Sequence, residues 1–113
     1  MSTVFKKIID KEIPAKILYE DEHCLAFHDL DAQAPSHVLL IPKKEIKSFN
    51  EVKAEDKELL GHMMTKVPEI ARLLGIAQDG FRVVCNTGSN GGQSVFHIHF
   101  HILGGRALAW PPG

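Results

Sequence analysis

The amino-acid sequence predicts an α+β fold with a mostly antiparallel sheet, built as a single domain over residues 1–113. The first observation is the order of its apolar segments, whose spacing predicts helix, strands, helix and strands along the chain. The second is continuity, because the sequence contains no internal repeat, low-complexity segment or linker. The third is composition, since 44% hydrophobic and 24% charged residues are typical of a soluble globular protein.

A short helix is predicted at the N-terminus. Ser2 and Thr3 belong to the residue types that favour helix N-caps, and Pro14 ends the segment. The apolar residues at helical spacing are Phe5, Ile8 and Ile9.

Five stretches are predicted as strands. Residues 17–20 and 24–29 flank the acidic turn "EDEH", and the apolar run 38–41 between two prolines is typical of a well-buried strand. Two more strands are expected at 81–86 and 96–103, joined by the loop "TGSNGGQS".

The main amphipathic helix is predicted within "AEDKELLGHMMTKVPEIARLLG", residues 54–75, where apolar residues recur at spacings of three and four. Gly75 is the expected C-cap residue. Pro68 lies inside this segment, and a proline costs a regular helix about 3 kcal/mol because it removes a hydrogen bond and crowds the preceding turn. We therefore expect a kink or a break at Pro68.

Charge and composition exclude several classes of partner. A net charge of −1 argues against broad binding to nucleic acid, which requires a basic face. No apolar run approaches the length of a membrane span or a signal peptide, so we expect no membrane partner. Cys24 and Cys85 lie far apart and form no CxxC motif, which favours a reducing, cytoplasmic location.

The segment "SVFHIHFHILGG" carries three of the seven histidines, His97, His99 and His101, at a spacing of two. Side chains alternate between the two faces of a strand, so these imidazoles are expected to share one face, with neighbours roughly 7 Å apart. The residues of the opposite face are Ile98, Phe100 and Ile102.

Three interpretations of the shared face remain open at this point. It could be the polar side of a half-buried strand, or a metal site, because His-x-His can place two nitrogens on one Zn²⁺. The metal interpretation lacks a nearby Asp, Glu or Cys ligand. Phosphoryl chemistry is favoured, since imidazole can both attack phosphorus and carry protons, and the preceding glycine-rich loop can present backbone N–H groups to an anion.

The motif "HIHFHIL" resembles the histidine-triad signature, His-φ-His-φ-His-φ-φ with φ apolar. Together with "KEIPAKILYEDEHCLAFHDLDAQAPSHVLLIPKK", "NTGSNGGQSVFHIHFHILGGR" and the terminal "WPPG", it resembles the Hint branch of the histidine triad (HIT) superfamily over about residues 4 to 113. The resemblance implies a HIT-like fold with a five-stranded antiparallel sheet and two helices, paired into a two-fold homodimer. It implies hydrolysis of the P–N bond of purine nucleoside 5′-phosphoramidates of the AMP or GMP type, with no cofactor and no metal.

The same resemblance implies a role for each matching residue. His99 would be the nucleophile that forms a nucleotidyl-imidazole intermediate, His97 and His101 would assist, and His37 would support them through a proton network. The residues implied to hold the phosphate are Asn86, Gly92, Gln93, Ser94 and Val95. Those implied to form the nucleoside pocket are Phe5, Ile8, Phe27, His28, Asp29 and Leu30, with Asp29 placed for the ribose hydroxyls. Trp110, in the C-terminal tail, would reach towards the partner's active site.

Two alternatives to this function are kept. One is a dinucleoside polyphosphate hydrolase of another HIT branch, although the "GGQS" and "WPPG" framing disfavours it. The other is a nucleotide-binding interaction protein in which turnover is incidental.

Overall fold

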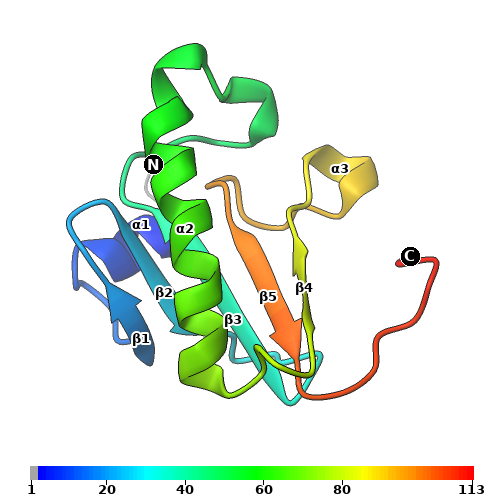
Figure 1. Cartoon of the computed structure of the whole chain (residues 1–113). Helices are drawn as coiled ribbons and strands as arrows, with labels where there is room; N and C mark the ends of the chain where they lie inside the picture. The colour runs from blue at the N-terminus through cyan, green and yellow to red at the C-terminus, as the bar shows by residue number, and fades with distance from the viewer. Residues whose placement is uncertain (1–2) are drawn as a thin grey trace.

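The computed structural model describes residues 3–113 as a five-stranded sheet with a long helix on one face and a short helix on the other (Figure 1). The strands are β1 (Ile17–Glu20), β2 (Cys24–His28), β3 (Ser36–Pro42), β4 (Phe81–Val84) and β5 (Phe100–Gly104). The helices are α1 (Val4–Ile9), α2 (Lys57–Leu74) and the short α3 (Gly88–Gly91), with two 3-10 turns at Phe49–Glu51 and Ala54–Asp56. The predicted α+β class is confirmed.

The strands lie in the order β1-β2-β3-β5-β4, and every neighbouring pair is antiparallel. β3 is the central strand, and its residues are buried except at the first position. A strand that is paired at both edges and covered on both faces can be apolar throughout, which explains the unbroken run at 38–41.

The two helices cover opposite faces of the sheet. In Figure 1, α2 crosses in front of the sheet and α1 lies behind β2. Val38 and Leu40 of β3 pack in the core beneath α2, whereas Leu39 and Ile41 pack in a second core with α1. Strand alternation therefore divides β3 between two hydrophobic layers.

The N-terminal helix begins where the sequence predicts. Thr3 is its N-cap, because the Thr3 hydroxyl accepts a hydrogen bond from the N–H of Lys6 at 3.1 Å. Phe5 and Ile8 are the buried residues of α1. Ser2, the other predicted cap residue, lies outside the described residues.

The predicted interruption at Pro68 is wrong in one respect, because α2 continues through it as one helix without a break. Pro68 lies on the exposed side of α2, where water can bond the carbonyl that its missing N–H leaves free. The neighbouring Val67 and Ile70 are buried in the core, and this packing holds the helix on both sides of the proline. Gly75 caps α2 as predicted, with φ of 73°.

The last strand is shorter than predicted, since β5 begins at Phe100 instead of residue 96. The register pairs Leu40 with Phe100, so Ile98 would come opposite Pro42, which has no N–H to donate. The N–H of Ile98 instead donates to the carbonyl of Ile46 at 2.7 Å. β2 and β4 also end earlier than predicted, at His28 and Val84, and the predicted loop at 87–94 contains α3.

None of the helices within residues 3–113 combines the length and the apolar composition that crossing a bilayer requires.

Candidate active site

Four histidines gather on the α1 side of the sheet, where β5 and the segment before it lie beside β3. Phe5 of α1 packs edge-on against the rings of His97 and His99, with centroids 6.2 and 5.0 Å away. The ring centroids of His99 and His101 are 5.1 Å apart, as are those of His37 and His101. Ile98, the residue between the first two histidines, packs in the core beneath α2. The alternation predicted from the sequence is confirmed, although only His101 belongs to the strand proper.

His99 has its tautomer fixed by the main chain. Its Nδ1 lies 2.8 Å from the carbonyl oxygen of His97, which can only accept, so Nδ1 carries the proton. The other nitrogen, Nε2, is left with a free lone pair. Burial lowers the pKa of His99, which favours the neutral imidazole.

His97 donates through the other ring nitrogen. Its Nε2 donates to the carbonyl of Pro42 at 2.7 Å, and the side chain is buried. Pro42 thus ends the pairing of β3 with the histidine segment and also anchors the first histidine. Burial lowers the pKa of His97 as well.

His37 and His101 form a directed hydrogen-bond chain. The backbone N–H of Gln33 donates to Nδ1 of His37 at 3.0 Å, so the proton of neutral His37 is on Nε2. That Nε2 lies 2.9 Å from Nδ1 of His101 and donates to it. Neutral His101 therefore carries its proton on Nε2. Asp29 Oδ2 lies 3.4 Å from Nε2 of His37, beside the same chain.

Burial first, and then the neighbouring imidazoles of His99 and His37, lower the pKa of His101 to about 4. In the ligand-free site at neutral pH, His101 is thus an uncharged N–H donor. A nearby anion would favour the protonated form of this imidazole.

An apolar pocket of about 500 Å³ opens beside this cluster, between α1, β2 and the chain that follows β2. It brings together all six residues implied for the nucleoside, which are Phe5, Ile8, Phe27, His28, Asp29 and Leu30. Phe5 and Phe27 meet edge-on with ring centroids 5.5 Å apart. Leu30 is 96% exposed, so it is a rim residue and not part of the core.

The glycine-rich loop is fastened by the side chain of Gln93. Its Nε2 donates to the carbonyls of Lys47 and Val95 at 2.7 and 3.1 Å, and its Oε1 accepts from the N–H of Gly88 at 3.0 Å. Gly88 and Gly92 have φ of 69° and 81°, which favour glycine. Gln93 therefore shapes the loop, while the neighbouring Ser94 is exposed.

Asn86 and Trp110 do not line this apolar pocket. Both line a separate pocket of about 540 Å³ between β4, β5 and the C-terminal tail. Arg82 holds this tail by donating to the carbonyl of Ala109 at 2.9 Å, and Trp110 is 80% exposed. Their implied roles in substrate binding remain predictions.

Two positioning contacts had no signal in the sequence. Gln33 acts through its backbone N–H, a group that every residue except proline carries. The carbonyl of Gln33 in turn accepts from Arg106 Nη2 at 2.9 Å, which ties the loop between β2 and β3 to the chain after β5.

Comparison with known proteins agrees with this architecture. The HIT domain model matches residues 10–108. A HIT-like protein of Synechocystis is 57% identical over 111 residues, which cover 98% of this chain and 96% of the relative. A HIT family hydrolase from Legionella pneumophila superposes with a TM-score of 0.97 at 46% identity, covering 99% of this chain and all of that one. A histidine triad protein from Clostridium difficile superposes with a TM-score of 0.92 at 42% identity, covering 96% and 95%. The chain belongs to the HIT domain family.

Proposed function

We propose that this protein hydrolyses the P–N bond of purine nucleoside 5′-phosphoramidates through a covalent nucleotidyl-His99 intermediate. One observation carries the proposal: His99 Nδ1 donates to the His97 carbonyl at 2.8 Å, so a free Nε2 lone pair stands beside an imidazole with its own proton relay. A hydrolase also agrees with the HIT family hydrolase that this chain resembles at 46% identity.

The nucleoside would occupy the apolar pocket of about 500 Å³, a volume within the usual range for small-molecule sites. The rings of Phe5 and Phe27, which line this pocket, offer apolar contacts for a purine base. The carboxylate of Asp29 would accept hydrogen bonds from the ribose hydroxyls. This placement would bring the 5′-phosphorus towards His99, because Phe5 contacts both the pocket and the His99 ring.

The first half-reaction forms one bond and breaks another. His99 Nε2 attacks phosphorus, the P–N bond of the substrate breaks, and the nitrogen leaves as an amine once it receives a proton. Bound phosphate favours protonation of His101, and the resulting imidazolium supplies that proton from Nε2.

The second half-reaction restores the enzyme. His101 takes a proton from water, the resulting hydroxide attacks phosphorus, and the bond to His99 Nε2 breaks. The products are a nucleoside monophosphate and neutral His99. Ser94, Asn86 and the amides near Gly92 and Val95 would bind the phosphoryl oxygens, with Gln93 holding the loop.

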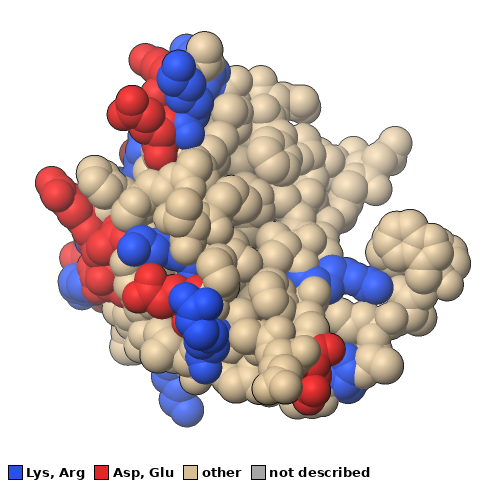
Figure 2. Space-filling view, viewed as in Figure 1, with Lys and Arg blue, Asp and Glu red and all other residues tan. Residues whose placement is uncertain are grey.

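The homodimer is also proposed. Several large apolar side chains are exposed on the single chain, namely Phe49, Met64, Val83, Phe96 and Trp110. Figure 2 shows that charged residues gather over the N-terminal end of α2 and the β1 side of the molecule, while the surface over β5 is almost uncharged. Pairing through that surface would bury apolar area and carry Trp110 towards the partner's pocket. A monomeric mass in light scattering at micromolar concentration would count against it.

The decisive experiment is single-turnover labelling with adenosine and guanosine 5′-phosphoramidates of a primary amine. Mass spectrometry after a denaturing, non-acidic quench is expected to find a nucleotidyl adduct on His99. The His99→Ala variant should still bind AMP but lose turnover by several orders of magnitude. His23→Ala, on an exposed turn remote from this site, is the matched control and should keep wild-type turnover.

Other outcomes would select the alternatives. Dinucleoside polyphosphates cleaved faster than every phosphoramidate would place the chain in another branch of the family. AMP binding with turnover unaffected by His99→Ala would remove the covalent mechanism and favour an interaction protein.

A further inference from the structure

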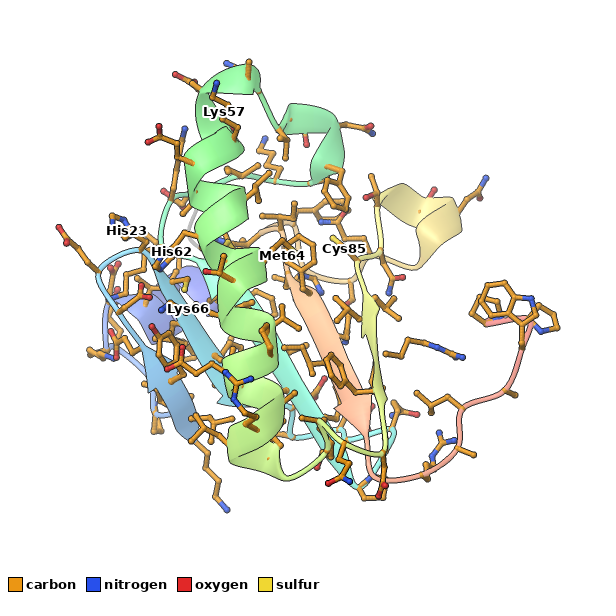
Figure 3. The ribbon with its side chains drawn as sticks, in the orientation of Figure 1. His23, Lys57, His62, Met64, Lys66 and Cys85 are labelled. Carbon is orange, nitrogen blue, oxygen red and sulfur yellow. The ribbon has the colours of Figure 1, made fainter. Side chains whose placement is uncertain are left out.

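A second group of reactive side chains lies on the other face of the sheet from the histidine triad. Asp21 is in the turn between β1 and β2, Cys24 begins β2, and His62 extends from α2. Figure 3 shows His23, His62 and Lys66 close together between α2 and the β1–β2 hairpin. Because Cys24 packs in the core beneath α2, this group shares no residue with the proposed phosphoramidase site.

The group converges on one carboxylate oxygen. Oδ2 of Asp21 lies 2.6 Å from Nε2 of His62 and 3.6 Å from Sγ of Cys24. The three ligand atoms, one each from Asp21, Cys24 and His62, all lie within 4.8 Å of one another. A carboxylate, an imidazole and a thiol are the donor types that bind Zn²⁺ in proteins.

The turn already orients the carboxylate. Oδ1 of Asp21 accepts the backbone N–H groups of His23 and Cys24 at 2.7 and 2.9 Å, and the Tyr19 hydroxyl donates to Oδ2 at 2.7 Å. Hydrogen bonds of this kind fix a ligating carboxylate around a metal. Asp21 and Cys24 are thus presented from one tight turn in a D-x-x-C spacing.

We propose that Asp21, Cys24 and His62 bind one Zn²⁺-class divalent ion, which joins the β1–β2 hairpin to α2. Zinc–ligand bonds of about 2.0 Å to nitrogen and oxygen and 2.3 Å to sulfur separate tetrahedral ligands by roughly 3.3–3.5 Å. The Asp21–Cys24 separation of 3.6 Å already fits that value, and His62 needs to retreat from its 2.6 Å contact by a side-chain rotation. As the metal–ligand bonds form, the Cys24 thiol releases its proton to solvent. Neutral His62 gives up the Nε2 proton that it donates to Asp21 and takes one on Nδ1, which frees the Nε2 lone pair for the metal.

The fourth coordination position of the ion would face solvent. Cys24 is fully buried, whereas the side chains of Asp21 and His62 are 22% and 31% exposed. The core therefore closes the sulfur side, and a water molecule completes the tetrahedron on the outer side. The ammonium group of Lys66 is held by other partners, because its Nζ lies 5.7 Å above the Tyr19 ring and 3.5 Å from a Glu69 carboxylate oxygen.

Cobalt(II) is the probe, because a thiolate bound to Co²⁺ gives a near-ultraviolet charge-transfer band that a site made only of histidines lacks. Titration of metal-free, reduced protein should develop this band to one equivalent, and Zn²⁺ should abolish it by displacement. Cys85→Ala is the matched control for the other cysteine and should keep the band. His99→Ala should keep it too, which separates this site from the triad.

The ligand variants decide the proposal. Cys24→Ala and His62→Ala should each lose the band, and zinc should raise the melting temperature of the wild type but not of His62→Ala. Because α2 tolerates alanine on its partly exposed side, His62→Ala remains informative if Cys24→Ala fails to fold. No band at excess Co²⁺, a band that survives His62→Ala, or a band lost in Cys85→Ala would overturn the assignment. Phosphoramidase activity plays no part in any of these readouts.

Discussion

The partly buried imidazole of His101 predicts how acid destabilises this protein. In the unfolded chain the imidazole has its ordinary pKa of 6.5, whereas burial beside His99 and His37 lowers it to about 4 in the folded protein. Between these two pH values the unfolded chain binds a proton that the folded chain does not. Acidification from pH 6.5 to 4 therefore favours unfolding, and the effect levels off below pH 4.

The magnitude follows from the gap between the two pKa values. A difference of about 2.5 pH units corresponds to about 3 kcal/mol of unfolding free energy. Burial lowers the pKa of His97 and His99 in the same direction, so the wild type should lose more than this in total. A variant that lacks only the His101 imidazole isolates its contribution.

The assay is urea unfolding of the wild type and His101→Gln at pH 7, 6, 5 and 4. Glutamine does not titrate in this range, so the wild type should lose about 3 kcal/mol more than the variant between pH 7 and pH 4. Imidazole NMR of the wild type should show His101 with its proton on Nε2 throughout the upper part of this range. Parallel loss of stability in the two proteins, or a proton on Nδ1 of His101, would refute the relay and the burial that we describe.

Two further predictions concern the chain around the site. Gln93→Ala removes three hydrogen bonds that fasten the glycine-rich loop, so it should cost about 2–4 kcal/mol of unfolding free energy and lower kcat/KM for phosphoramidates. Gln78→Ala, at an exposed position, is the control in the unfolding and kinetic assays. Equal behaviour of the two variants would contradict the loop's dependence on Gln93. Gly105→Ala should cost about 2 kcal/mol or more in urea unfolding, because φ is 92° and a Cβ would lie 2.8 Å from Pro35 Cβ. Gly61→Ala is the control and should be neutral or stabilising, because no atom lies within 4 Å of the added Cβ. A Gly105→Ala protein as stable as Gly61→Ala would contradict the predicted clash with Pro35.

Much of the fold was predictable because its signals are local. The cap residue Thr3, the glycine that ends α2 and the apolar spacing of both main helices follow from the geometry of single elements. The break predicted at Pro68 failed because tertiary packing of Val67 and Ile70 holds the helix across the proline. Propensity is a local quantity, and packing with the rest of the chain overrides it.

Part of the candidate site could likewise be predicted from the sequence, and part could not. The three histidines of the triad could be named from one motif in one stretch of chain, and the residues that line the apolar pocket were named from the family resemblance. The backbone groups that fix the tautomers could not, because the N–H of Gln33 and the carbonyl of Pro42 have no residue-specific signature. The Gln33 contact depends on the turn before β3, and the Pro42 contact on how the end of β3 lies beside the segment before β5.

The sequence by itself determined that His97, His99 and His101 share one face and that apolar residues anchor the other, because alternation follows from strand geometry alone. Only the tertiary structure decided that β5 starts at Phe100, since that depends on a proline in the neighbouring strand. It also decided which imidazole nitrogen carries each proton. Asp21 and His62 lie 41 positions apart in the chain, and no spacing rule relates them, so only the packing of α2 on the hairpin brought them together with Cys24.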